Sequence, residues 1–268
     1  MPLPILLVPM ALKGTAVVAG VAGVGVTTNG VKKRKEANDT MESIESHHAK
    51  NMAKFESENE KTTQAMDKLG KLELDILHSF SEFSDVFEKI KNRLTFAAYT
   101  KNGVTLQRYD GEKIKEVSVG AATLGVGLLV GGIICNFTGG KLSDKADEAW
   151  VQMRGAERKI NTICKYLGDL RSTADRYYTT LSQVNTVYQN HLMSLKILTR
   201  FGHADWNFFT LEEKRRTENT VLLVGLLYDM CKVELVLKSE RENSMNTINK
   251  TAVETAINSA NAVLADKF

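Results

Sequence analysis

Two acid–histidine pairs have the spacing of metal ligands on a helix. Glu45 precedes His48 by three residues. Asp75 precedes His78 by the same interval. Di-iron carboxylate sites use such pairs, but they need two pairs on different helices and two further carboxylates that face them. These pairs fall on one predicted helix, about 45 Å apart at 1.5 Å per residue, so we expect no metal site.

The other nucleophiles and bases form no catalytic group that local sequence supports. No Ser/His/Asp or Cys/His arrangement is indicated, and we expect the remaining histidines, His47, His191 and His203, on surfaces or helix stripes. The cysteines are widely spaced and form no CxxC pair, which argues against a zinc site and a disulfide framework. We expect no catalytic residue and no enzyme activity.

A glycine pair near the N-terminus has the spacing of a phosphate-binding loop. Gly25 and Gly30 are separated by four residues, but Val31 stands where the loop requires a lysine. Small residues at helix-packing spacing explain these glycines better. We expect no nucleotide and no other cofactor.

Composition narrows the possible partners and permits long helices. The net charge of +3 is too small and too evenly spread for a nucleic-acid-binding face. All three prolines lie in the first nine residues. Because proline inside a helix costs about 3 kcal/mol, the rest of the chain can form uninterrupted helices. Acidic residues are expected on solvated helix faces.

Apolar residues recur at steps of three and four over two stretches, 31–95 and 138–203, which predicts two long coiled-coil helices. We call each recurring set a stripe. The first stripe contains Met41, Ile44, His48, Met52, Phe55, Asn59, Thr62, Met66, Leu69, Leu72, Ile76, Phe80, Phe83, Phe87, Ile90 and Leu94. The second contains Leu142, Ala146, Ala149, Met153, Ala156, Ile160, Ile163, Leu167, Leu170, Ala174, Tyr177, Leu181, Val184, Tyr188, His191, Leu195 and Leu198. Packing should be looser where the first stripe is polar than around its three phenylalanines at 80, 83 and 87.

These helices predict a mainly all-α fold, an elongated antiparallel long-helix hairpin or bundle with an apolar, glycine-rich tip. Residues 1–30 form an apolar Gly-rich N-terminal segment. Residues 96–116 alternate around Asn102-Gly103, which predicts a small β-hairpin between the first helix and the apolar run. Residues 204–268 are expected to be helices packed on the bundle. One begins at the capping box of Thr210 and Glu213 and carries Val221 to Leu237; a closing helix follows within 243–268.

The run from Val117 to Phe137 contains no charged residue and is, at about 21 residues, long enough to cross a bilayer as a helix. The side chains expected to insert are Val117, Leu124, Val126, Leu128, Leu129, Val130, Ile133, Ile134 and Phe137. The glycines expected to allow close helix packing are Gly120, Gly125, Gly127, Gly131 and Gly132. A basic cluster suited to an anionic membrane surface follows the N-terminal segment: Lys32, Lys33, Arg34 and Lys35.

A Gly-rich apolar N-terminus, the step KKRKEAND, a helix containing LGKLELDIL, the apolar segment and a second long helix together resemble a group of poorly characterised bacterial helical proteins with glycine-rich membrane segments. In design the chain is also similar to the cytolysin A-like α-pore-forming toxins, whose soluble form hides an apolar tongue against a helical bundle. It departs from them in two ways: we expect it to lack an export signal, because no basic residue precedes its first apolar stretch, and its tongue is one span long.

The function expected from these features is a membrane-inserting, oligomerising helical effector that permeabilises a membrane, as a toxin or an intracellular or antiphage defence effector. The partners expected are a lipid membrane, further copies of the chain, and a protein activator or immunity partner, with no nucleic acid. We expect a cytoplasmic soluble form, a membrane-associated form, or both. Two alternatives remain: a membrane-anchored coiled-coil scaffold, and a soluble helical bundle that acts in protein interactions.

Overall fold

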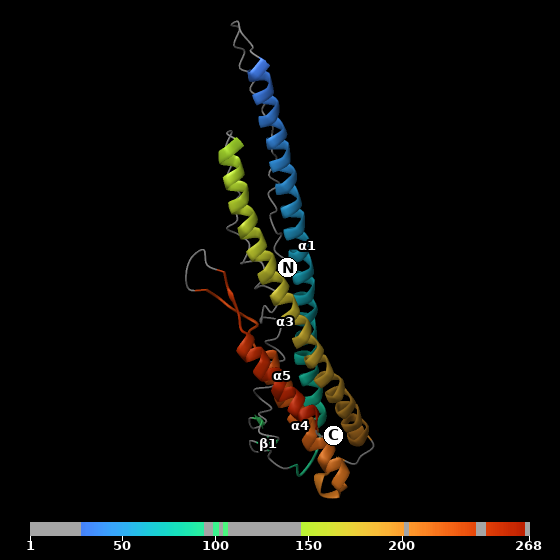
Figure 1. Cartoon of the computed structure of the whole chain (residues 1–268). Helices are drawn as coiled ribbons and strands as arrows, with labels where there is room; N and C mark the ends of the chain where they lie inside the picture. The colour runs from blue at the N-terminus through green and yellow to red at the C-terminus, as the bar shows by residue number, and fades with distance from the viewer. Residues whose placement is uncertain are drawn as a thin grey trace. The chain divides into compact units, whose positions relative to one another are not determined.

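The computed structural model describes residues 28–93, 99–101, 104–106, 146–200, 204–239 and 245–265. These residues form a mainly all-α fold, as predicted. The long helices are α1 (Thr28–Phe87) and α3 (Ala146–Arg200). The C-terminal helices are α4 (Leu211–Cys231) and α5 (Lys250–Leu264), and a short 3₁₀ turn, η1 (Trp206–Phe208), precedes α4 (Figure 1).

The chain divides into two compact units, and both long helices contribute to each of them. One unit contains Met1–Ser57 and Ile134–Cys164; the other contains Glu58–Ile133 and Lys165–Phe268. In the first unit, Ile44 of α1 and Met153 of α3 are buried together, and Trp150 packs against them. The large core lies in the second unit, where α1, α3, α4 and α5 all supply buried residues.

Helices α1 and α3 run parallel to each other. In the second unit, Thr62 contacts Leu167. Further along both helices, Ser79 contacts Tyr188. From the first contact to the second, the residue numbers increase on both helices. In an antiparallel pair the number would increase on one helix and decrease on the other. The first unit shows the same direction, because its contacts include His47–Trp150 and Lys54–Asn161.

The predicted antiparallel hairpin is therefore wrong, and so is the idea of a tip that joins adjacent helix ends. The physical reason is that a stripe of apolar residues at steps of three and four defines a face but no direction, so either orientation buries it. Residues 117–137 themselves lie outside the described residues.

Most stripe residues whose burial the structure describes are buried, and the expected difference in packing along α1 is confirmed. Phe80 and Phe83 are fully buried and Phe87 is 2% exposed. Met52 and Phe55, by contrast, are only partly buried. Helix α1 ends earlier than predicted: Phe87 is its last residue, and Asn92 has a positive φ of 56°. Asparagine tolerates this left-handed conformation better than most residues, and it does not continue a helix.

The hairpin predicted around Asn102-Gly103 is confirmed. Strand β1 (Tyr99–Lys101) pairs antiparallel with β2 (Val104–Leu106), and Lys101 lies opposite Val104 across a two-residue connection. This length is the one that tight hairpin turns with Asn-Gly favour. Strand β2 lies beside α4 and α5.

The C-terminal region confirms one prediction and corrects another. Thr210 and Glu213 form the capping box that starts α4, and α4 is buried over most of its length. However, α4 ends at Cys231 and does not reach Leu237, because Val236–Leu237 form strand β3, paired antiparallel with β4 (Thr247–Ile248). Helix α5 starts only after this pair, with Asn249 as its N-cap.

Candidate functional site

A buried carboxyl group is the most unusual chemical feature of the described core. Glu73 on α1 is 2% exposed, and within the described residues its Oε2 atom has no hydrogen-bond partner. Burial raises the pKa of Glu73 to about 8, because the charged form loses its hydration and gains no cation in exchange. Glu73 is therefore mostly protonated at neutral pH.

The charge of this carboxyl affects side chains on two other helices. Tyr177 on α3 is fully buried, and its hydroxyl donates a 2.7 Å hydrogen bond to the carbonyl oxygen of Met230 on α4. Burial raises the pKa of Tyr177, and the nearby Cys231 and Glu73 raise it further. Burial and Glu73 likewise raise the pKa of the Cys231 thiol. We call Glu73, Tyr177 and Cys231 the buried acid cluster.

The buried acid cluster is uncharged at neutral pH and suits no nucleophilic chemistry. A thiol attacks as the thiolate, and an apolar environment that raises its pKa makes it inert. What the cluster can do is respond to separation of the helices: if α4 moved away from α1, Glu73 would be hydrated and could ionise. Its chemistry is therefore that of a helix contact whose stability depends on protonation.

The burial of Glu73 was not predicted, because acidic residues were expected on solvated helix faces. A signal was present: Glu73 stands four residues after Leu69 and four before Leu77, and both leucines are 2% exposed. Residues four apart lie on the same side of a helix. Glu73 therefore lies on the same side of α1 as Leu69, which belongs to the predicted stripe, and Leu77, which does not. The core that contains both leucines also includes residues of α4.

Two other polar atoms are buried without partners among the described residues: Asn59 Oδ1 on α1 and the Tyr166 hydroxyl on α3. Each such group costs about 1–3 kcal/mol. Thr62 is satisfied, because its hydroxyl lies 2.8 Å from the carbonyl oxygen of Glu58 and 3.1 Å from that of Leu167. The described α1–α3 contact is thus less stable than an apolar contact of the same size.

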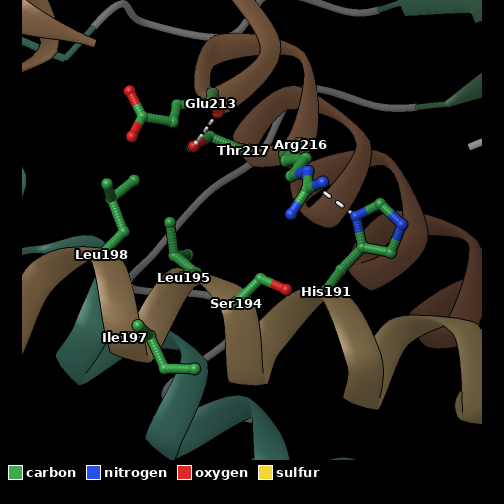
Figure 2. Close-up of a pocket in the computed structure, with 8 residues that line it drawn as sticks. All are labelled: His191, Ser194, Leu195, Ile197, Leu198, Glu213, Arg216 and Thr217. Carbon is green, nitrogen blue, oxygen red and sulfur yellow. Dashed lines mark hydrogen bonds between the residues drawn. The ribbon is translucent and has the colours of Figure 1, made fainter. Parts of the chain in front are cut away.

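A cleft of about 180 Å³ lies between the end of α3 and the start of α4. Figure 2 shows Ser194 and Leu195 of α3 facing Glu213 and Thr217 of α4 across it. Its polar side chains form hydrogen bonds within their own helices or at a helix cap. The Ser194 hydroxyl donates to the Asn190 carbonyl at 3.0 Å, the Thr217 hydroxyl donates to the Glu213 carbonyl at 2.8 Å, and the Glu213 carboxylate accepts from the Thr210 N–H.

His191 at the edge of this cleft is held by a backbone group. Its Nδ1 atom lies 3.4 Å from the carbonyl oxygen of Arg216, and burial lowers its pKa below the usual range. A neutral histidine in the Nδ1–H tautomer can donate this bond. In this tautomer Nε2 is the acceptor nitrogen, whereas the Ser194 hydroxyl donates to the Asn190 carbonyl. The cleft is a contact between α3 and α4 with apolar side chains at one edge.

The sequence-predicted site residues fall mostly outside what the structure describes. The structure does not describe residues 117–137, which contain all of the predicted inserting side chains and packing glycines. His203 also lies outside the described residues. The basic cluster at positions 32–35 is helical and belongs to the beginning of α1. The two acid–histidine pairs both lie on α1, and the described residues contain no group of three or more His, Cys, Asp or Glu side chains that could hold a metal ion.

No helix among the described residues is long and apolar enough to cross a membrane. The chain matches no protein-family model, no curated protein and no solved structure. Function therefore has to be inferred from the chain's own residues.

Proposed function

We propose that the protein is a membrane-inserting, oligomerising helical effector that permeabilises a membrane, as a toxin or an intracellular or antiphage defence effector. The observation that carries this proposal is the uncharged run from Val117 to Phe137. About 20 apolar residues suffice to cross the hydrocarbon core of a bilayer. Left in water, such a run would cost about 25 cal/mol for each Å² of apolar surface exposed, so it must be packed or inserted.

The buried polar atoms of the bundle support a change of state. The α1–α3–α4 core contains an unpartnered carboxyl oxygen on Glu73, and Asn59 and Tyr166 add two more unpartnered polar atoms within the described residues. Water would satisfy these groups once the helices separate. A core of this kind lowers the free energy that opening the bundle requires, which suits a protein that must release an apolar segment.

Oligomerisation would follow from the same two features. If the bundle opened, the apolar faces of α1 and α3 would be exposed to water. The same faces of another copy of the chain could then cover them. Glycines at positions 120, 125, 127, 131 and 132 would let neighbouring copies approach closely in lipid. A protein activator or an immunity partner would act by shifting the balance between closed and open bundles.

Dye release from liposomes tests this function directly. Wild type should release the dye, and Leu128→Asp should not, because a carboxylate at the centre of a membrane helix costs about 2.5–3.5 kcal/mol or more. The matched control is Val151→Asp, since Val151 is 70% exposed on α3 and a charge there should leave release unchanged. Circular dichroism checks that each variant is folded.

The other outcomes separate the alternatives. Wild type that floats with liposomes without releasing dye would identify an anchored coiled-coil scaffold. Wild type that neither binds lipid nor releases dye, together with a Leu128→Asp variant that unfolds, would identify the run as part of a soluble helical bundle and would overturn the proposal.

A further inference from the structure

Exposed apolar side chains gather where α3 passes into α4. Of the seven large apolar side chains that are exposed in the described residues, four fall between positions 193 and 211. Phe208 and Leu211 are the most exposed of these, at 81% and 71%. Met193 and Ile197, at 57% and 53%, precede them on the last turns of α3, where Ile197 lines the cleft of Figure 2. We call Phe208 and Leu211 the α3–α4 turn surface.

The backbone beneath this surface is firmly held. Trp206 and Phe209, which flank Phe208, are each 5% exposed, and their ring centroids lie 5.7 Å apart. Lys91, which follows the end of α1 by four residues, forms two backbone hydrogen bonds with this turn: Lys91 N donates to Ala204 O at 2.7 Å, and Trp206 N donates to Lys91 O at 3.0 Å. Two buried aromatic side chains thus hold this turn, while Phe208, the last residue of η1, is exposed to solvent.

The charges near the turn are predominantly positive. Residues 88–93 and 204–216, which these hydrogen bonds bring together, contain six basic and four acidic side chains. Three of the acids are engaged locally: Asp205 accepts from Asn92 and from Asn207 N, Glu213 caps α4, and Glu212 pairs with Arg216. Besides Arg216, the basic side chains next to the turn are Lys89, Lys91, Arg93, Lys214 and Arg215. Arg93 donates to the carbonyl oxygens of Glu88 and Ile90, and Lys214 lies over the ring of Trp206.

We propose that the α3–α4 turn surface docks the folded protein onto an anionic lipid bilayer. Phe208 and Leu211 enter the boundary between headgroups and acyl chains, and the basic side chains beside them lie near the lipid phosphates. Apolar side chains combined with neighbouring lysines and arginines are the pattern of interfacial membrane binding. This inference rests on the proposed membrane function, but docking does not require residues 117–137 to insert.

Charge favours a lipid surface over a second copy of the chain. Two such turns facing each other would bring two positively charged surfaces together, whereas an anionic bilayer attracts them. The attraction contributes about 1 kcal/mol for each basic residue near an anionic membrane surface and is screened by salt.

Flotation of the full-length protein with vesicles tests the docking surface. Wild type should bind phosphatidylcholine vesicles that contain phosphatidylglycerol, bind pure phosphatidylcholine vesicles much more weakly, and lose affinity as salt is added. Phe208→Ser/Leu211→Ser should bind the anionic vesicles at least about tenfold more weakly, because two apolar side chains are removed. Val151→Ser, at a position that is also about 70% exposed but lies in the other unit, should bind like wild type.

The outcomes separate docking from insertion. Leu128→Asp should still bind anionic vesicles while it releases no dye; if it releases dye like wild type, the proposed function fails but the docking surface stands. Wild-type binding by a folded Phe208→Ser/Leu211→Ser variant would overturn the docking proposal. The same holds if wild type prefers neutral vesicles, or if the double substitution leaves lipid binding intact and abolishes self-association in ultracentrifugation.

Discussion

The hydroxyl of Tyr177 on α3 donates a hydrogen bond to the carbonyl oxygen of Met230 on α4, next to the buried carboxyl of Glu73 on α1. Three helices thus meet at side chains that are neutral while the bundle is closed. Burial raises the pKa of Glu73 to about 8. The carboxyl therefore keeps its proton at neutral pH while the helices are packed together.

Glu73→Gln should remove a loss of stability that wild type shows as pH rises. The raised pKa means that the folded chain keeps a proton that the unfolded chain releases near pH 4.5, so stability is full below pH 4.5 and falls until about pH 8. Between these pH values, the ionisation of Glu73 should lower the free energy of unfolding of wild type by up to about 5 kcal/mol. Glutamine cannot ionise, so the variant should exceed wild type most above pH 8 in urea denaturation.

Asp75→Asn is the matched control for that experiment, because Asp75 is an exposed carboxyl on the same helix. It should show the same pH dependence as wild type. Identical pH profiles for wild type and Glu73→Gln would show that Glu73 is not buried in the folded protein.

Tyr177→Phe should lower the free energy of unfolding by about 0.5–1.5 kcal/mol, because it removes one of the hydrogen bonds to the buried Met230 carbonyl, which still accepts from Val233 N at 3.0 Å. Tyr178→Phe makes the same chemical change at the next position, where the side chain is only partly buried, and should have little effect. Denaturation midpoints measured by circular dichroism compare the two. Equal losses would mean that the hydrogen bond to Met230 contributes nothing specific.

Zero-length cross-linking with a carbodiimide should join Glu82 of α1 to Lys196 of α3. These side chains form an ion pair only if the two helices run parallel in the observed register. Mass spectrometry of tryptic peptides identifies the product, and Glu82→Gln should abolish it. An antiparallel pair would instead join Glu82 to lysines near the start of α3, such as Lys159.

Phe83→Ala should destabilise the protein by about 3–5 kcal/mol, because it empties a fully buried aromatic position. Phe55→Ala should cost less than half as much, since Phe55 is partly exposed already. Chemical denaturation of the two variants measures the difference. Losses of similar size would contradict the uneven packing along α1.

The apolar faces of the helices follow from the sequence alone, because the pattern that defines them is local. Steps of three and four place residues on one side of a helix whatever lies opposite, and the predicted residues from Ile76 to Phe87 and from Leu167 to Tyr188 are buried. The hairpin at Asn102-Gly103 and the capping box of Thr210 and Glu213 were equally predictable. Each depends on a few neighbouring residues and not on distant partners.

Only the tertiary structure decided how these faces are combined. Nothing in an apolar stripe distinguishes a parallel from an antiparallel partner, so the direction of α3 became visible only in pairs such as Thr62 and Leu167. Glu73 is buried on the same side of α1 as two leucines whose core also includes residues of α4, and β3 and β4 are two residues each, too short to leave a pattern. The run from Val117 to Phe137 lies outside the described residues and stays a prediction. Local patterns decide what a segment can bury, and long-range packing decides what it is buried against.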